Sequence, residues 1–320
     1  MAKKVLVTGI SGFAGSFLAE YLIAQSEYEV SGTYLSSASL KNLTNVEKKL
    51  HLDKIDLKDS QKTLHFIKEV KPDLIFHLAA LPAVGASFDR PSETIVNNVT
   101  AEINVLESVR NMGLTTCRIL IVSSADMYGR VSAKDLPIDE ETGFYPTNTY
   151  AVSKIAQDYL GLQYFMSYNM QIIRARPFNH VGPRQTTGFV IADFAQKIAQ
   201  MEKGKIEPIL RVGNLNTKRD FTDVRDMARA YVLLLEKGKA GDVYNIGTGV
   251  SYTIADMLDM LLSYAKITIQ VKEDPSLIRP QDSPDRVCNN KKLTALIDWE
   301  PIIPLKQTLE ETLDYWRNIV

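Results

Sequence analysis

The fold is decided by Val5-Leu6-Val7-Thr8-Gly9-Ile10-Ser11-Gly12-Phe13-Ala14-Gly15, a short apolar run that leads into a G-x-x-G-x-x-G pattern. Such a run before a glycine turn and a helical period is typical of a buried strand that turns tightly into a helix. The glycines would let a diphosphate approach the helix N-terminus, where unpaired N–H groups and the helix dipole favour negative charge. Glycine spacing alone would equally suit a plain tight turn. Its place after the first strand of a strand–helix series favours a dinucleotide site.

The same strand-then-helix order repeats along the first half of the chain. Short apolar runs predict buried strands at 5–7, 28–34, 50–52, 74–78, 119–122 and 172–175. Longer amphipathic segments predict helices at 12–24, 59–69, 91–112 and 149–168, each long enough for a crossover between parallel strands. The pattern predicts an α/β fold built on a doubly wound parallel sheet, the Rossmann arrangement.

The chain changes character from about Phe178 onward. Gly, Pro, Asn and Arg cluster there, and apolar runs that predict strands occur only at 209–212, 243–246 and 267–271. We therefore expect a smaller C-terminal α/β lobe over the carboxyl edge of the sheet. The predicted dinucleotide-binding domain comprises 1–177 plus 220–249, and the predicted substrate lobe comprises 178–219 plus 250–320.

Composition excludes several classes of protein. The 320 residues are 45% hydrophobic and 23% charged, which are ordinary globular values. A net charge of -1 gives no sign of nucleic acid or an anionic membrane as partner. Cys117 and Cys288 are too few and too far apart for a disulfide framework or a zinc site, so we expect no metal and a reducing, cytoplasmic location. The short apolar run after Lys3 and Lys4 does not resemble a signal peptide.

The second predicted strand bears on the choice of dinucleotide. NAD sites usually place a carboxylate after this strand, roughly 20 residues past the glycine loop. Here the chain reads Gly32-Thr33-Tyr34-Leu35-Ser36-Ser37, without a carboxylate, and Ser36, Ser37 and Lys41 could meet a 2'-phosphate. The sequence thus favours NADP, with NAD as the alternative. Asp56, before Leu57, could accept a hydrogen bond from an adenine amine, or could simply cap a helix.

A tyrosine and a lysine at helical spacing form the candidate catalytic pair. Tyr150 and Lys154 lie four residues apart, so a helix places them on one face. A tyrosine has a pKa of about 10 and works poorly as an acid or base near neutral pH unless a cation stabilises its phenolate, which Lys154 could do. Ser124 lies just past the strand predicted at 119–122, where ligand sites of open α/β sheets occur. The alternative is a surface Tyr-Lys pair and a serine that only ends a strand.

Four further segments contribute to a family resemblance: Phe76-His77-Leu78-Ala79-Ala80, Asn97-Asn98-Val99-Thr100, Arg219-Asp220-Phe221 and Asn245-Ile246-Gly247-Thr248-Gly249. With the glycine loop, Ser124, Tyr150 and Lys154, they resemble the extended short-chain dehydrogenase/reductase family in its nucleotide-sugar branch. The resemblance covers nearly the whole chain. Residues 175–183 and 213–226 look most like enzymes of GDP-mannose metabolism, and closest to those that reduce GDP-4-keto-6-deoxy-D-mannose.

This resemblance implies roles for individual residues. The implied cofactor-binding residues are Gly9, Ser11, Gly12, Phe13, Ala14, Gly15, Ser36, Asp56, Leu57, Leu78, Ala79, Ala80, Asn98, Tyr150, Lys154 and Pro177. The implied substrate-binding residues are Ser87, Ser124, Asn179, Val190, Arg219 and Arg279, with the two arginines as clamps on a sugar-nucleotide diphosphate. Arg219 could instead pair with Asp220 or Asp223, and Arg279 could be an exposed loop charge.

Asp126 separates the possible reactions. The 4,6-dehydratases of this family carry a threonine at the place of Ser124 and a glutamate at the place of Asp126, where the glutamate removes the C5 proton. Aspartate is one methylene shorter, and a base must come within about 3 Å of its proton. We therefore expect NAD(P)H-dependent reduction of the C4 ketone of GDP-4-keto-6-deoxy-D-mannose to GDP-D-rhamnose, with Tyr150 as proton donor, although Asp126 could simply hydrogen-bond neighbouring backbone.

Three alternatives to the reductase stay open. The first is a GDP-mannose 4,6-dehydratase, the second is another epimerase or dehydratase of nucleotide sugars, and the third is a dinucleotide-binding sensor without turnover. Members of the family often pair through the helices that correspond to 91–112 and 149–168, so the resemblance implies a homodimer.

Overall fold

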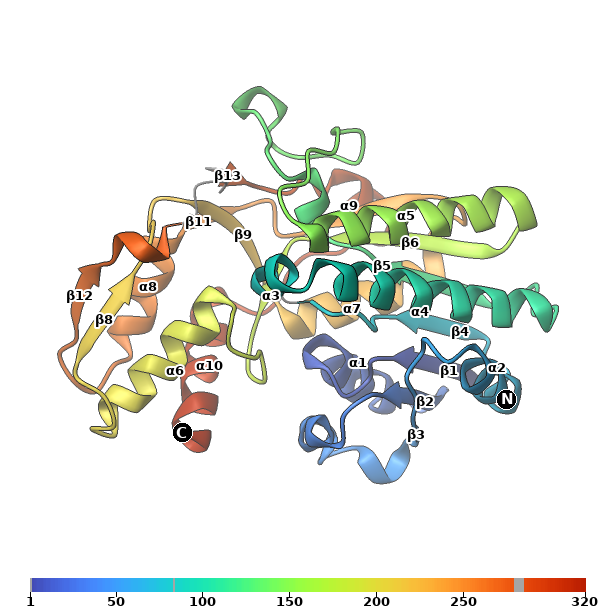
Figure 1. The fold of residues 1–320 in the computed structure, drawn as a ribbon, viewed down its shortest axis with the longest axis horizontal. Helices are drawn as coiled ribbons and strands as arrows, with labels where there is room; N and C mark the ends of the chain where they lie inside the picture. Colours follow the sequence, from blue (N-terminus) through green and yellow to red (C-terminus); the bar gives the residue numbers. More distant parts are fainter. Residues whose placement is uncertain (1, 83, 279–284) are drawn as a thin grey trace.

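A seven-stranded parallel sheet forms the centre of the computed structural model, which describes residues 2–82, 84–278 and 285–320 (Figure 1). The strand order is β10-β6-β5-β4-β1-β2-β3. The strands are β1 (Lys3–Thr8), β2 (Tyr28–Tyr34), β3 (His51–Lys54), β4 (Leu74–His77), β5 (Arg118–Val122), β6 (Gln171–Pro177) and β10 (Val243–Ile246). The order reverses between β1 and β4, and ligands of doubly wound sheets bind outside the carboxyl ends of the strands at such a point.

Helices cover both faces of this sheet. One face packs on α1 (Phe13–Ile23), α7 (Val224–Lys237) and α9 (Lys291–Ile297), and the other on α2 (Ser60–Val70), α4 (Pro91–Asn111) and α5 (Thr149–Tyr168). Side chains alternate between the two cores, so that Val5 and Val7 belong to the first and Leu6 to the second. Both faces are buried, which is why the strands read as unbroken apolar runs. The prediction of a doubly wound sheet is confirmed.

A second group of elements has a hydrophobic core of its own. It contains α6 (Val190–Glu202), α8 (Ile254–Ser263) and α10 (Leu305–Ile319), which Figure 1 shows on the left. Two small sheets accompany it, one of β7 (Asn179–Val181), β9 (Lys218–Asp223), β11 (Ser251–Thr253) and β13 (Asp285–Arg286), the other of β8 (Ile209–Val212) and β12 (Gln270–Glu273). Because β6 ends at Pro177 and β7 begins at Asn179, this group follows directly from the carboxyl edge of the central sheet. The exact domain boundaries stay a prediction.

One predicted strand is wrong in position. The apolar run at 267–271 predicts a strand, but β12 covers Gln270–Glu273, and all four of its residues are exposed. Within the described ranges its one partner strand is β8, in parallel, and Ile269 packs against the lobe's core just before β12 begins. An exposed strand needs no apolar run, so burial patterning misplaced it.

Short elements complete the chain. They are α3 (Val84–Asp89) and the 3-10 segments η1 (Ser37–Leu43), η2 (Glu47–Lys49), η3 (Ala125–Tyr128), η4 (Ala133–Asp135) and η5 (Pro275–Leu277). Within the described ranges, the helices include none with the length and apolar character of a membrane span.

Candidate active site

The glycine loop joins β1 to α1 in a conformation that requires glycine. Gly9 has φ +70°, and a Cβ there would lie 3.0 Å from the Ala79 Cα. A Cβ at Gly15 would lie 2.3 Å from the Gly9 carbonyl oxygen, so no larger residue fits. The first turn of α1 carries no acidic side chain, and Gly12 at its N-cap has no side chain to compete for the free N–H groups. This helix end fits an anionic diphosphate.

A cavity of about 490 Å³ opens above this loop and extends to the carboxyl ends of β4, β5 and β6. Most of the residues expected to contact the cofactor line it: Gly9, Ser11, Gly12, Phe13, Ala14, Gly15, Ser36, Asp56, Leu57, Leu78, Ala79, Ala80, Tyr150, Lys154 and Pro177. Ser124, Asp126, Asn179 and Val190 line the same cavity. The fold therefore brings the predicted cofactor, catalytic and part of the substrate residues to one place.

Some predicted site residues do not line the cavity in the described part of the chain. Asn98 is buried and connects α4 to two neighbouring segments. Its Nδ2 donates to Ser153 Oγ in α5 (2.9 Å), and its Oδ1 accepts from the Leu81 N–H (2.7 Å). Ser87 is buried and donates to the Val84 carbonyl oxygen (2.7 Å). Arg219 is buried in β9, where it donates to the Lys218 carbonyl oxygen (2.7 Å). Arg279 lies outside the described residues.

The end of the cavity beside β2 and η1 includes a side chain that the sequence did not reveal. Ser39 lines it, with its Oγ 2.6 Å from Ser11 Oγ. Ser36 lines the cavity and also caps η1, as its Oγ accepts from the Ala38 N–H (3.3 Å). Asp56 has a similar double role, since its Oδ1 accepts from the Lys58 N–H (3.0 Å). Lys41 is not among the described residues that line the cavity.

The catalytic candidates meet where β5 ends and α5 begins. Asn148 caps α5 by accepting the Ala151 N–H (2.8 Å), and this start places Tyr150 and Lys154 on the buried face of the helix. Lys154 Nζ lies 5.9 Å from the centre of the Tyr150 ring and donates to the Val122 carbonyl oxygen (2.9 Å). Ser124 lies two residues past the end of β5, at the N-cap of η3, and its Oγ accepts from the Asp126 N–H (3.2 Å).

Burial controls the electrostatics of this group. It raises the pKa of Tyr150 above its ordinary value, the Asp126 charge raises it further, and the Ser124 hydroxyl opposes both. Burial lowers the pKa of Lys154 to about 8, and the Glu102 charge opposes this shift. In this structure the Lys154 ammonium donates to the β5 backbone, so its stabilisation of the Tyr150 phenolate stays a prediction.

Arg286 is a functional candidate that sequence reasoning missed. It lines the cavity from β13 and forms an ion pair with the Asp126 carboxylate, 160 residues away in the chain. Its side chain is 9% exposed, against 26% for Asp126. A partner so distant in sequence leaves no local signal, since only the packing of β13 against β9 brings it to η3.

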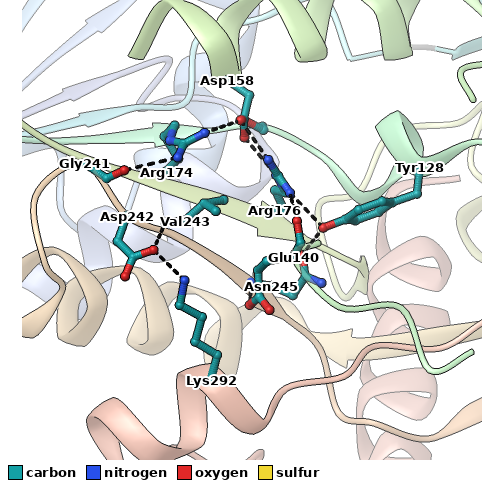
Figure 2. Close-up of polar contacts among 11 residues, drawn as sticks. Tyr128, Glu140, Asp158, Arg174, Arg176, Gly241, Asp242, Val243, Asn245 and Lys292 are labelled. Atoms are coloured by element: carbon teal, nitrogen blue, oxygen red, sulfur yellow. Dashed lines mark hydrogen bonds and ion pairs between the residues drawn. The ribbon is translucent and has the colours of Figure 1, made fainter. Parts of the chain in front are cut away.

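A buried ionic network fixes the catalytic helix to the sheet (Figure 2). Asp158, one turn beyond Lys154, accepts from Arg174 Nη1 (2.7 Å), Arg176 Nε and Nη2 (3.0 Å each) and Ser123 Oγ (3.0 Å). Arg176 also donates to the Tyr128 hydroxyl (3.0 Å) at the end of η3. The network thus ties α5 to the end of β5, to β6 and to η3, and η3 carries Asp126 with Ser124 at its N-cap.

Comparison with known proteins identifies the family. The family model described as GDP-mannose 4,6 dehydratase matches residues 6–312. The chain belongs to this family. It is 33% identical to the GDP-6-deoxy-D-mannose reductase of Pseudomonas aeruginosa, over 100% of this chain and 99% of that protein. It is 31% identical to a GDP-mannose 4,6-dehydratase of Vibrio cholerae, over 84% of this chain and 74% of the relative.

A solved structure agrees with these matches. RMD from Pseudomonas aeruginosa, in complex with NADPH, superimposes with a TM-score of 0.86 at 32% identity and covers 100% of both chains. The resemblance to the nucleotide-sugar branch of the short-chain dehydrogenases/reductases is therefore confirmed, as is the prediction of an NAD(P)-dependent oxidoreductase of that branch.

Proposed function

We propose that this enzyme uses NADPH to reduce the C4 ketone of GDP-4-keto-6-deoxy-D-mannose to GDP-D-rhamnose, in the cytoplasm, and that NAD is the less favoured cofactor. The observation that carries the proposal is the meeting of Ser124, Tyr150 and Lys154 in one cavity with an Asp126 carboxylate that is already paired with Arg286. The similarity to a GDP-6-deoxy-D-mannose reductase over the whole chain, and to the NADPH-bound structure, supports the substrate and the cofactor.

The cofactor, when bound, supplies the hydride that C4 accepts. The protein supplies the proton for the resulting oxyanion, and Tyr150 is the donor because its raised pKa keeps the phenol protonated. Ser124 would hydrogen-bond the ketone oxygen and hold it beside that phenol. Lys154, as a cation at the same cavity, would stabilise the phenolate that proton transfer leaves behind.

The ion pair favours reduction over elimination. A dehydratase needs a free carboxylate that can remove the C5 proton of the sugar. In this protein the Asp126 carboxylate is held by the largely buried Arg286, and its side chain is short. The Asp126 carboxylate would have to give up this ion pair before it could remove the C5 proton, so the arrangement supports the reductase against the dehydratase alternative.

The substrate residues complete the proposal. Asn179 and Val190 line the cavity at the lobe side, where the sugar nucleotide would lie across the gap from the glycine loop. We retain Ser87, Arg219 and Arg279 as candidates for contacts that form when the nucleotide binds, and we assign residues 178–219 and 250–320 to the substrate-binding lobe.

The proposal is tested by measuring how much NADPH is oxidised for each sugar that is converted. GDP-4-keto-6-deoxy-D-mannose, made by a separate dehydratase, should cause one NADPH to be oxidised per sugar, followed at 340 nm, and the product should gain two mass units. Tyr150→Phe should lose turnover but bind NADPH as the unaltered protein does. The dehydratase alternative makes the opposite prediction: GDP-mannose alone would lose water without net cofactor change, and that result would overturn the proposal.

We also propose a homodimer that forms through α4 and α5. These helices expose apolar side chains that a monomer leaves in water, namely Val96 (54% exposed), Val152, Tyr159 and Met166 (74% exposed). Sedimentation should give a dimer at micromolar concentration. A Met166→Glu variant should shift the protein towards monomer, and a monomeric unaltered protein would disprove the pairing.

A further inference from the structure

His180 is a cavity-lining side chain to which the proposed reaction assigns no role. It lies in β7, and its ring stacks on the Phe13 ring, with 5.6 Å between the ring centres and 13° between the planes. Phe13 is the first residue of α1. The stack therefore places a histidine of the lobe against the helix end that fits a diphosphate.

The one hydrogen bond of the His180 ring within the described ranges fixes which nitrogen carries the proton. His180 Nδ1 lies 3.3 Å from the Phe178 carbonyl oxygen. A carbonyl oxygen only accepts, so Nδ1 must be the N–H donor of this pair. In the neutral ring Nε2 is then an acceptor, and it has no hydrogen-bond partner among the residues that the structure describes. The side chain is only half-buried, so Nε2 is not enclosed by the packed interior.

The His180 ring is neutral near pH 7. Burial lowers its pKa below the ordinary value, and the bond to the Phe178 carbonyl opposes this fall. Nε2 thus offers a lone pair to the cavity and has no proton to donate. Phosphate oxygens are themselves acceptors, whereas a hydroxyl group can donate. The ligand group that suits this nitrogen is therefore a hydroxyl.

The strand order shows which end of the cavity His180 faces. β7 follows β6, which lies on the β4 side of β1, whereas Ser36 and Ser39 follow β2 on the other side of β1. Ser124 follows β5, so it lies on the same side of β1 as His180. The hydroxyl groups expected at this end are those of the nicotinamide ribose of the cofactor and of the hexose of the sugar nucleotide.

We propose that His180 is a ligand-binding residue whose Nε2 accepts a hydrogen bond from a ligand hydroxyl at the reacting end of the cavity, on the nicotinamide ribose or on the hexose. The inference rests on the proposed function, because it concerns the ligands of that reaction. The stack on Phe13 and the bond to Phe178 hold the imidazole in place before a ligand arrives, so little side-chain freedom is lost on binding. Removing Nε2 should therefore lower the affinity for the ligand that supplies the hydroxyl.

The test replaces His180 by asparagine and by glutamine in the full-length protein. The asparagine amide can take the place of Nδ1 and keep the bond to the Phe178 carbonyl, but it does not reach the place of Nε2, whereas the longer glutamine can offer an acceptor oxygen there. We expect His180→Asn to weaken binding of NADPH or of GDP-mannose at least about fivefold in calorimetric titrations at pH 7, and His180→Gln to retain most of it. His65→Asn makes the same change at an exposed position of α2 and should leave both affinities unchanged.

Shortened ligands show which hydroxyl is bound. A loss for NADPH alone assigns the ribose, and a loss for GDP-mannose alone assigns the hexose. GDP lacks the hexose and 2'-phospho-ADP lacks the nicotinamide ribose, so His180→Asn should bind both as the unaltered protein does.

Three results would overturn the inference. The first is an unchanged affinity of His180→Asn for both NADPH and GDP-mannose. The second is an equal loss for a shortened ligand and its parent, which would indicate a phosphate contact. The third is a loss with glutamine but not with asparagine, which would mean that only the bond to Phe178 matters. These affinities need no turnover, so the expected losses without ketone reduction would refute only the proposed function.

Discussion

Replacing Asp158 by asparagine should destabilise the protein strongly. The carboxylate is 0% exposed and accepts hydrogen bonds from Arg174, Arg176 and Ser123. Asparagine has the same shape but no charge, and it presents an NH₂ group where an acceptor is needed. Two guanidinium groups would then be left in the interior without their counter-charge, as the convergence on Asp158 in Figure 2 makes clear.

The size of the effect follows from the burial of all three ions. Removing one partner of a buried ion pair costs about 3–5 kcal/mol. Because asparagine retains one carbonyl oxygen that can accept, we expect about 3 kcal/mol, a large part of a typical folding free energy of about 5–15 kcal/mol. Turnover should fall as well, since Asp158 holds α5 on β5 and β6.

The assay is urea unfolding at pH 7, followed by circular dichroism, with Asp314→Asn as control. Asp314 makes the same kind of pair with Arg317, but its side chain is 57% exposed, so the same chemical change should cost less than about 1 kcal/mol. Equal losses for the two variants, or a loss below about 1 kcal/mol for Asp158→Asn, would refute the reasoning from burial.

Three other changes have definite expected outcomes. Gly15→Ala should weaken NADPH binding at least about tenfold in a fluorescence titration, since the new Cβ would lie 2.3 Å from the Gly9 carbonyl oxygen; unchanged affinity would contradict the loop's role. Arg286→Met should slow ketone reduction about tenfold, equivalent to ~1.4 kcal/mol, by leaving the Asp126 charge unbalanced, and a second change, Asp126→Asn, should recover most of the rate. Burial lowers the pKa of His77 to about 3 in the folded protein, from an ordinary value of about 6.5. Between these two pH values only the unfolded chain binds a proton at His77. The free energy of unfolding should therefore fall by about 1.4 kcal/mol per pH unit as the pH drops through this window. His77→Gln should remove that slope from urea midpoints measured between about pH 4.5 and 6.5, and an unchanged slope would exclude His77 as its source.

Most of the central sheet could be predicted because its signals are local. The apolar run at 119–122 and the helical period at 149–168 reappear as β5 (Arg118–Val122) and α5 (Thr149–Tyr168). Burial on both sides of a parallel strand forces continuous apolar sequence, and helix packing forces its own period. The strand expected at 267–271 is displaced to Gln270–Glu273 for the same reason, because the exposed β12 carries no such constraint.

The candidate site could be predicted only in part. The glycine loop and the Tyr150–Lys154 spacing are short-range patterns, and both lie on the cavity. The resemblance to the family implied that Asn98 contacts the cofactor and that Ser87 contacts the substrate. Both side chains are instead buried beside the cavity, where they bond the backbone or a neighbouring helix. Their positions along the helices did not show whether each side chain would face the cavity or the packed interior beside it.

The sequence by itself determined the doubly wound sheet, the helix end that fits a diphosphate, and the residue types available for proton transfer. These features depend on sequence patterns with spacings of two to four residues, and a short stretch of chain is enough to contain such a pattern. Only the tertiary structure decided that Asp126 is paired with Arg286 and that Lys154 bonds the β5 backbone. Such contacts join residues far apart in the chain, and their charges take on chemical meaning only when packing removes water from around them.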